Sequence, residues 1–260
     1  MLPPPSTDMR SRTPAMTLKT RLALAAALLL SQAAQRWSHG LSGTITVELP
    51  AVVPADPQRA EELLRTARLL DFPLLVRPEA AVHHMVKKYM DWGAAGLMMP
   101  WTESQQQIDA MRDAVFTPPL GRRGPGGPSI YANRSLDRKG WDEVEESFFL
   151  MFQVESRAGT EAVSQMASAP WIDATMLGPY DLSLNLSRWG EMDHPEVVAA
   201  IRKVRLDSEA VGKPCGMVVG TPEQARFWMD DGFRLLLIPD PAILAAQRLR
   251  SFLGELRTSG

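Results

Sequence analysis

The ten residues Met176-Leu-Gly-Pro-Tyr-Asp-Leu-Ser-Leu-Asn185 are the most informative stretch of this chain for its fold class. A short apolar run ends at a Gly-Pro turn, and the carboxylate of Asp181 follows directly. The preceding apolar run ends in the same way, because Glu155 closes the stretch Phe152-Gln-Val-Glu-Ser156. Arg77 closes a third such run. Two acids and one guanidinium therefore follow strand-like segments.

From residue 44 onward, short apolar or β-branched runs alternate with amphipathic stretches of helical period. The runs predict strands at 44–49, 73–77, 96–100, 148–155, 174–178, 216–219 and 234–238. The amphipathic stretches predict helices at 57–70, 82–92, 104–114, 160–168, 195–211 and 222–231. This alternation favours parallel strands joined by right-handed crossovers. The count is one strand short of a closed barrel, so we expect an α/β (β/α)8 TIM barrel with an atypical or incomplete first βα unit.

Composition excludes several classes of protein. The 260 residues are 45% apolar, enough for one large core, and one barrel domain is expected over residues 17–260. With 28 basic against 30 acidic residues the net charge is -2, which argues against nucleic-acid binding. A single cysteine, Cys215, excludes an internal disulfide framework and a cysteine-rich zinc site.

The N-terminal region allows two interpretations. Residues 1–16 are expected to be a disordered tail, since they are rich in proline and serine. Basic residues then precede an Ala/Leu run at 22–30, a pattern that fits a signal peptide within 16–35. The run is shorter than the roughly 20 residues that span a bilayer, and it also fits a buried helix. We favour the helix, a cytoplasmic location and no membrane partner.

One connection is unusually long. Residues 117–128 are dense in glycine and proline, and irregular sequence continues to about 138. Loops of this length are often functional, and Arg122 and Arg123 suggest a role in handling an anion. A disordered insertion is the alternative.

In a (β/α) barrel the C-terminal ends of the strands meet at one face, where active sites lie. Arg77, Glu155 and Asp181 are expected there. Two carboxylates suit a hard cation such as Mg²⁺ or Mn²⁺ and leave coordination positions for water and a 2-keto acid. Arg77 would then stabilise the negative charge of an enolate.

Each residue also has a structural interpretation. Asp181 could cap a helix that begins near residue 182. Glu155 could pair with Arg157, and Arg77 with Glu79. His83 and His84 begin a helix close to the Arg77 strand, where either a proton-transfer role or a solvated helix start is reasonable.

With these residues in view, the chain resembles the HpcH/HpaI aldolase family of the phosphoenolpyruvate/pyruvate barrel superfamily, over about residues 57–244. The matching segments are Leu75-Val-Arg-Pro78, Asp91-Trp-Gly-Ala94, Met98-Met-Pro100, Pro118-Pro-Leu-Gly-Arg-Arg-Gly124, Gln153-Val-Glu155, Gly178-Pro-Tyr-Asp-Leu-Ser183, Asp193-His-Pro-Glu196, Gly212-Lys-Pro214 and Asp231-Gly-Phe-Arg234.

The resemblance implies a metal-dependent carbon–carbon lyase that uses a pyruvate enolate from a 2-keto acid. It implies Glu155 and Asp181 as ligands of Mg²⁺, Mn²⁺ or Co²⁺, and Arg77 as the group that stabilises the enolate. It further implies Asp91 as the aspartate of a His–Asp dyad, and Gly178 with Pro179 as the turn that binds substrate. A homo-oligomer, commonly a hexamer, is also implied.

The departure from the family lies at the second strand. An Asp-x-Glu-His signature is usual there, whereas this chain reads Thr44-Ile-Thr-Val-Glu-Leu-Pro50, with Pro50 near the position of the acid/base histidine. Glu48 could replace one carboxylate. Decarboxylation of oxaloacetate needs no C–H base, so an enzyme similar to macrophomate synthase is one alternative. A catalytically impaired family member is the other.

Overall fold

The structure is a computed structural model that describes residues 44–47, 57–70, 72–239 and 241–258. The expectations for the N-terminal tail, for the apolar run at 22–30 and for Glu48 and Pro50 lie outside these residues.

A seven-stranded, wholly parallel sheet forms the centre of the molecule. Its order is β1-β7-β6-β5-β4-β3-β2, with β1 and β2 at the two edges. The strands are β1 (Thr44–Val47), β2 (Leu75–Val76), β3 (Gly96–Met99), β4 (Phe149–Val154), β5 (Ala174–Leu177), β6 (Cys215–Val218) and β7 (Leu235–Ile238). All seven fall within one or two residues of the expected runs. Among the described residues no ladder joins β1 to β2, so their strands form a curled, open part of the expected barrel. The expectation of an atypical first unit concerns residues outside the described ranges.

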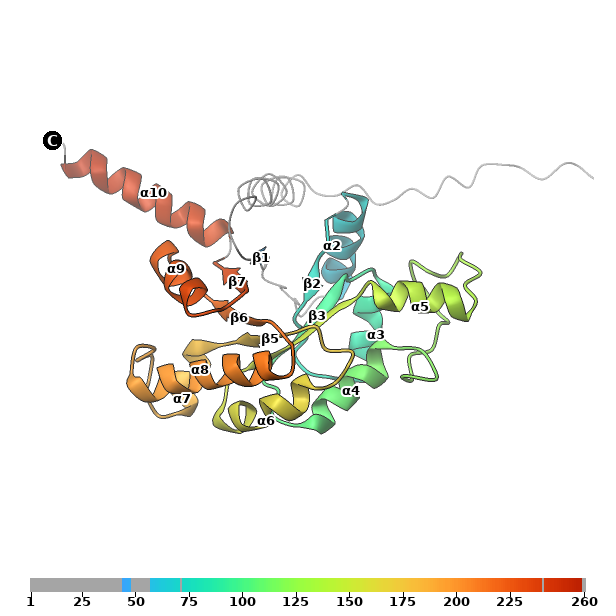
Figure 1. The fold of residues 1–260 in the computed structure, drawn as a ribbon. Helices are drawn as coiled ribbons and strands as arrows, with labels where there is room; N and C mark the ends of the chain where they lie inside the picture. Colours follow the sequence, from blue (N-terminus) through green and yellow to red (C-terminus); the bar gives the residue numbers. More distant parts are fainter. Residues whose placement is uncertain (1–43, 48–56, 71, 240, 259–260) are drawn as a thin grey trace, which may run out of the picture.

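Helices follow the strands in the expected alternation, and α3, α4, α6 and α8 lie along one side of the sheet (Figure 1). They are α2 (Pro57–Leu69), α3 (His83–Asp91), α4 (Gln105–Val115), α5 (Arg138–Glu146), α6 (Arg157–Ala167), α7 (Pro179–Asn185), α8 (Pro195–Ala210), α9 (Pro222–Asp230) and α10 (Pro241–Thr258). Two of them, α5 and α10, were not expected from the sequence, and α7 was expected only in the capping interpretation of Asp181, as a helix from about residue 182. None of the described helices is both long and apolar enough to cross a bilayer.

The alternation of side chains along each strand separates two apolar layers. The outward residues pack against the helices in one large core, which includes Leu97, Met99 and Phe152. The residues that alternate with these along each strand point to the opposite, inner face. There they form a second cluster that packs against other strand residues. That inner cluster consists of Met98, Met151, Ala174, Met176, Leu235 and Leu237. The inner face is therefore a packed methionine-rich layer at mid-height of the strands.

Candidate active site

The inner face changes from apolar to polar at the C-terminal ends of the strands. On β4, Gln153 and then Glu155 follow Met151 at steps of two residues, so all three side chains share that face. Gly178 comes two residues after Met176 of β5, and Arg77 comes two residues after Leu75 of β2, so both belong to the same inner face. The sheet thus places these residues in one layer above the methionines.

Arg77 is held by two partners from β4. Its Nε donates to Oε1 of Gln153 at 2.8 Å, and its Nη2 lies 3.3 Å from Oε1 of Glu155. No described residue accepts a hydrogen bond from Nη1, and the guanidinium is partly exposed. The alternative pairing of Arg77 with Glu79 is wrong. The arrangement leaves one edge of the guanidinium for a substrate oxygen.

Glu155 is almost completely buried, with 2% of its surface exposed. Its Oε2 accepts a hydrogen bond of 2.7 Å from the backbone N–H of Trp101, the second residue after β3. Burial raises the pKa of the Glu155 carboxyl, the Trp101 amide and Arg77 lower it, and the Asp181 carboxylate raises it again. The alternative pairing with Arg157 is wrong, because Arg157 bonds to Glu196 at 2.9 Å.

Asp181 lies in the first turn of α7, which begins at Pro179. It is not the N-cap residue, which is Gly178, so the capping interpretation is wrong. Its carboxylate is close enough to that of Glu155 to raise the pKa of the latter both by charge and by hydrogen bonding. The two carboxylates therefore lie at the same end of the strands.

Gly178 and Pro179 form the turn that brings Asp181 to this position. The N–H of Gly178 donates to the carbonyl of Val154 at 3.0 Å, which places Gly178 opposite Glu155. A β-carbon on Gly178 would lie 2.7 Å from Cγ of Glu155 and 3.0 Å from Nε2 of Gln153. Only glycine fits here without displacing the two side chains.

The structure does not bring Asp91 to this group. Asp91 is the last residue of α3, a helix that runs from the Arg77 end of the sheet back toward the start of β3. There its carboxylate pairs with Lys87 and, at 2.9 Å, with Nη2 of Arg123, whose side chain is fully buried. Within this chain, Asp91 therefore belongs to an ion pair at the opposite end of the barrel.

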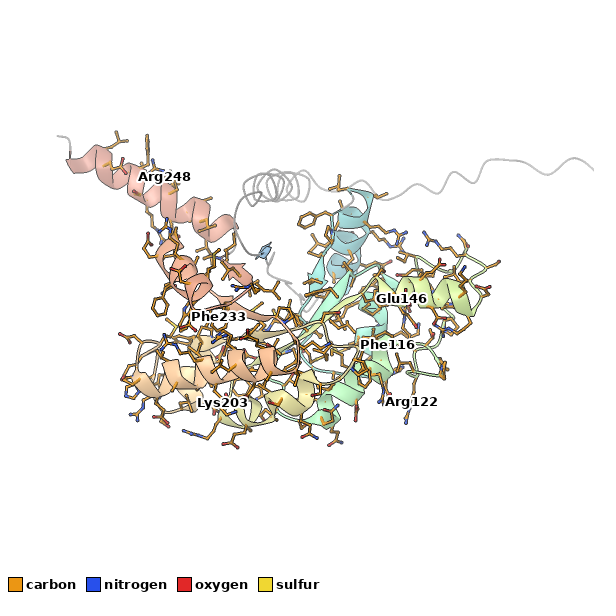
Figure 2. The ribbon with its side chains drawn as sticks, in the orientation of Figure 1. Phe116, Arg122, Glu146, Lys203, Phe233 and Arg248 are labelled. Carbon is orange, nitrogen blue, oxygen red and sulfur yellow. The ribbon has the colours of Figure 1, made fainter. Side chains whose placement is uncertain are left out.

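The long connection lies at that opposite end too, which corrects its expected role as an anion-handling loop. Arg123 packs over the rings of Trp141 at 5.3 Å and Tyr131 at 5.5 Å, and so anchors the connection. Arg122 pairs with Asp113 at 3.1 Å at the surface (Figure 2). Neither arginine meets the two carboxylates.

Among the described residues, no histidine forms a hydrogen bond with Arg77, Glu155 or Asp181. His83 and His84 are exposed at the start of α3, as the solvated interpretation expected. His194 precedes α8, and its Nδ1 accepts a hydrogen bond of 3.2 Å from the N–H of Glu196.

The donor set fits a hard divalent cation. Two carboxylates converge, one of them buried and carrying a raised pKa, and a cation would offset both their repulsion and the burial of charge. In the described part of the chain no third His, Cys, Asp or Glu completes a cluster, so water and substrate would supply the other ligands. Mg²⁺, Mn²⁺ and Co²⁺ all accept such a set.

Sequence reasoning missed two members of the site. Gln153 could have been found, because it lies two residues before Glu155 on a strand and must share its face. Trp101 contributes a backbone N–H, and no pattern of side chains indicates that role.

Several known proteins are similar to this chain. The chain is 31% identical over 182 residues to the hydroxypyruvate/pyruvate aldolase of Delftia acidovorans, covering 67% of this chain and 65% of that protein. It is 33% identical over 161 residues to the protein of the same name from Chromohalobacter salexigens, covering 59% of this chain and 61% of that protein. The matches thus span less than two thirds of the length of these relatives.

Among solved structures, an HpcH/HpaI aldolase/citrate lyase family protein from Burkholderia cenocepacia superposes with a TM-score of 0.75 at 26% identity, covering 90% of each chain. An HpcH/HpaI aldolase from Desulfitobacterium hafniense superposes with a TM-score of 0.73 at 23% identity, covering 92% of this chain and 96% of that one. These likenesses confirm the barrel fold. The family model for HpcH/HpaI aldolase/citrate lyase matches residues 56–236. This chain therefore belongs to the HpcH/HpaI aldolase/citrate lyase family.

Proposed function

We propose that the protein is a divalent-metal-dependent aldolase that joins or cleaves carbon–carbon bonds through the enolate of pyruvate. The observation that carries this proposal is the convergence of Glu155 and Asp181 beside the guanidinium of Arg77. Membership of an aldolase family and the aldolase names of its relatives support the reaction class.

In the condensing direction, the C3–H bond of pyruvate breaks, its proton passes to water, and its electron pair forms the enolate. The enolate C3 then attacks the carbonyl carbon of an aldehyde, whose oxygen takes up a proton to give a 4-hydroxy-2-oxo acid. A divalent cation held by Glu155 and Asp181 would supply Lewis-acid polarisation of the keto oxygen. Arg77, positioned by Gln153, would hold a fixed positive charge near the same oxygen.

The contacts of the buried Glu155 carboxylate hold it in a fixed position next to Arg77. Because the Trp101 N–H occupies Oε2, the carboxylate is held in one orientation while Oε1 faces Arg77. Such preorganisation strengthens electrostatic stabilisation, since the groups need not reorient as charge develops.

Decarboxylation of oxaloacetate is a second candidate. Loss of CO₂ breaks the C3–C4 bond and leaves its electron pair as the same enolate, so no base for a C–H bond is needed. The observation that favours it is that no described histidine bonds to Arg77, Glu155 or Asp181.

Two assays separate these candidates. Proton NMR in D₂O with Mg²⁺ measures exchange of the pyruvate methyl protons, which requires a base. Pyruvate release from oxaloacetate, compared with Mg²⁺ alone, measures enolate formation without one. Methyl exchange would support the aldolase, whereas oxaloacetate turnover alone would favour the second candidate. Neither activity above the metal-only rate would refute both.

A matched pair of variants tests the site. We expect Arg77→Met to lower kcat in either assay about 10²- to 10³-fold, as loss of one charge-stabilising group commonly does. The control is Arg157→Met, which removes an exposed guanidinium two residues from Glu155, whose only partner among the described side chains is Glu196. Its kcat should stay within about twofold; equal losses in both variants would contradict the assignment of Arg77.

A further inference from the structure

Each of the two carboxylates has an exposed aromatic residue next to it. Trp101, whose N–H bonds to Glu155, is 44% exposed. Tyr180, which directly precedes Asp181 in α7, is 54% exposed. Both lie at the C-terminal end of the strands, where the rest of the layer is polar. Large apolar rings left exposed around a polar centre commonly mark a contact surface for a ligand.

The backbone of Trp101 is held in an unfavourable conformation. Its φ is +47°, in the left-handed region that bulky residues rarely adopt because it is sterically unfavourable. Hydrogen bonds on both sides maintain it. The N–H donates to Glu155 at 2.7 Å, and the carbonyl accepts from Nε2 of Gln107 at 3.0 Å. Gln107 is in turn fixed by the capping box of α4. Surrounding structure thus enforces a strained position for this residue beside the carboxylates.

Tyr180 is positioned by the connection between α7 and α8. A β-carbon on Gly190 would lie 3.4 Å from Cε2 of the tyrosine ring, so the ring lies against that glycine. Gly190 has a φ of +78° and its N–H donates to Oγ of Ser183 at 3.0 Å. The connection therefore supports one side of the ring.

The arginines near these two rings indicate which class of ligand the site can accept. Arg157 and Arg188 lie on the same rim, and both are bonded to Glu196, at 2.9 Å and 2.8 Å. Arg77 is shared between Gln153 and Glu155. Of the described arginines on this rim, none is left to receive a second anionic group. In the described part of this rim, aromatic rings are available, whereas each arginine is already paired with a carboxylate of the protein.

We infer that Trp101, together with Tyr180, selects the electrophile of the aldol reaction, and that this electrophile is an aldehyde with an aromatic or other flat apolar group and no anionic group. The inference rests on the proposed function, since it concerns the aldehyde that meets the enolate. The indole of Trp101 stacks against the flat group while Arg77 and the carboxylates hold the keto acid. A ring contact of this kind raises kcat/KM by about tenfold.

The experiment measures aldol addition of pyruvate to benzaldehyde, to glycolaldehyde and to succinic semialdehyde, in the full-length protein with Mg²⁺. The wild-type protein should show the highest kcat/KM with benzaldehyde. Trp101→Asn removes the ring but keeps a residue that tolerates a left-handed backbone. It should lower the ratio of kcat/KM for benzaldehyde to kcat/KM for glycolaldehyde about tenfold. Trp101→Phe should restore most of the loss.

Trp189→Ala is the matched control, since Trp189 is an exposed tryptophan on the same rim that bonds to neither carboxylate. It should behave like the wild type. A preference for succinic semialdehyde, equal losses with all three aldehydes, or the same loss in Trp189→Ala would overturn the inference. So would dissociation of an oligomer in Trp101→Asn, measured by light scattering, because the ring would then be an interface residue.

Oxaloacetate turnover distinguishes failure of this inference alone from failure of the proposed function. If the wild-type protein releases pyruvate from oxaloacetate and Trp101→Asn does so equally well without any change in aldehyde preference, the inference alone falls. If the wild-type protein shows neither oxaloacetate turnover nor methyl exchange, the proposed function falls and the inference with it.

Discussion

Gly178 and Glu155 face each other across β5 and β4 so closely that a β-carbon on the glycine would lie 2.7 Å from Cγ of the glutamate. The φ of Gly178 is −101°, which any residue can adopt, so its constraint is purely one of space. We expect Gly178→Ala to displace the Glu155 carboxylate from Asp181 and Arg77 and to lower turnover at least about tenfold, because small misplacements at a reacting centre are costly.

The control for that substitution is Gly124→Ala, in a connection where a β-carbon would have no neighbour within 4 Å. Isothermal titration with Mg²⁺ should show weaker binding only for Gly178→Ala. Unchanged metal affinity and turnover in Gly178→Ala would contradict the close approach.

The raised pKa of Glu155 predicts how stability depends on pH. Burial and the Asp181 carboxylate outweigh Arg77 and the Trp101 amide, so native Glu155 holds its proton more tightly than in the unfolded chain. The unfolded state therefore binds fewer protons, and stability falls as pH rises from about 4.5 through the raised pKa of the native state, by up to about 1.4 kcal/mol per unit. Metal-free Glu155→Gln should lack this decline.

Urea unfolding in EDTA at several pH values between 5 and 8 measures the difference between the two proteins. Contributions from parts of the protein remote from Glu155 are the same in both proteins and cancel. A difference that stays constant or grows in favour of the wild type with rising pH would show that the native pKa is not raised.

Arg123 and Asp91 form a buried ion pair, and its loss should be severe. Arg123→Met leaves the Asp91 carboxylate buried with only Lys87 as its charged partner, at a cost of about 3–5 kcal/mol in the free energy of unfolding. The double variant Arg123→Met/Asp91→Asn should lose less than the sum of the single changes, since neither charge then remains alone. Strict additivity in denaturant unfolding would argue that the pair is not coupled.

Cys215 should be unreactive in the native protein. Burial raises the pKa of its thiol to about 12, and the thiolate is the reactive form. At pH 8 we expect no reaction with a disulfide reagent over an hour in buffer, and one equivalent of thiol after denaturation in urea. Rapid labelling of the folded protein would indicate that β6 opens.

The strands were predictable because each is a short apolar run bounded by a break, and the charged residues that end these runs mark the active end of the barrel. On that basis alone the sequence predicts that Glu155 and Asp181 lie at the same end of the strands. The local pattern could not place Asp91, because its partner Arg123 comes from a separate segment that packs beneath α3. It also missed α5, whose start depends on the side chain of Asp137 accepting from Gly140.

The methionine layer beneath the site has a consequence for oxidative damage. Met98, Met151 and Met176 are each at most 3% exposed, so an oxidant in solution cannot reach their thioethers while the strands stay closed. Sulfoxide formation at any of the three would insert a polar oxygen where apolar side chains meet directly under the carboxylates. The rate at which peroxide oxidises these three sulfurs would therefore measure how often the strands open transiently.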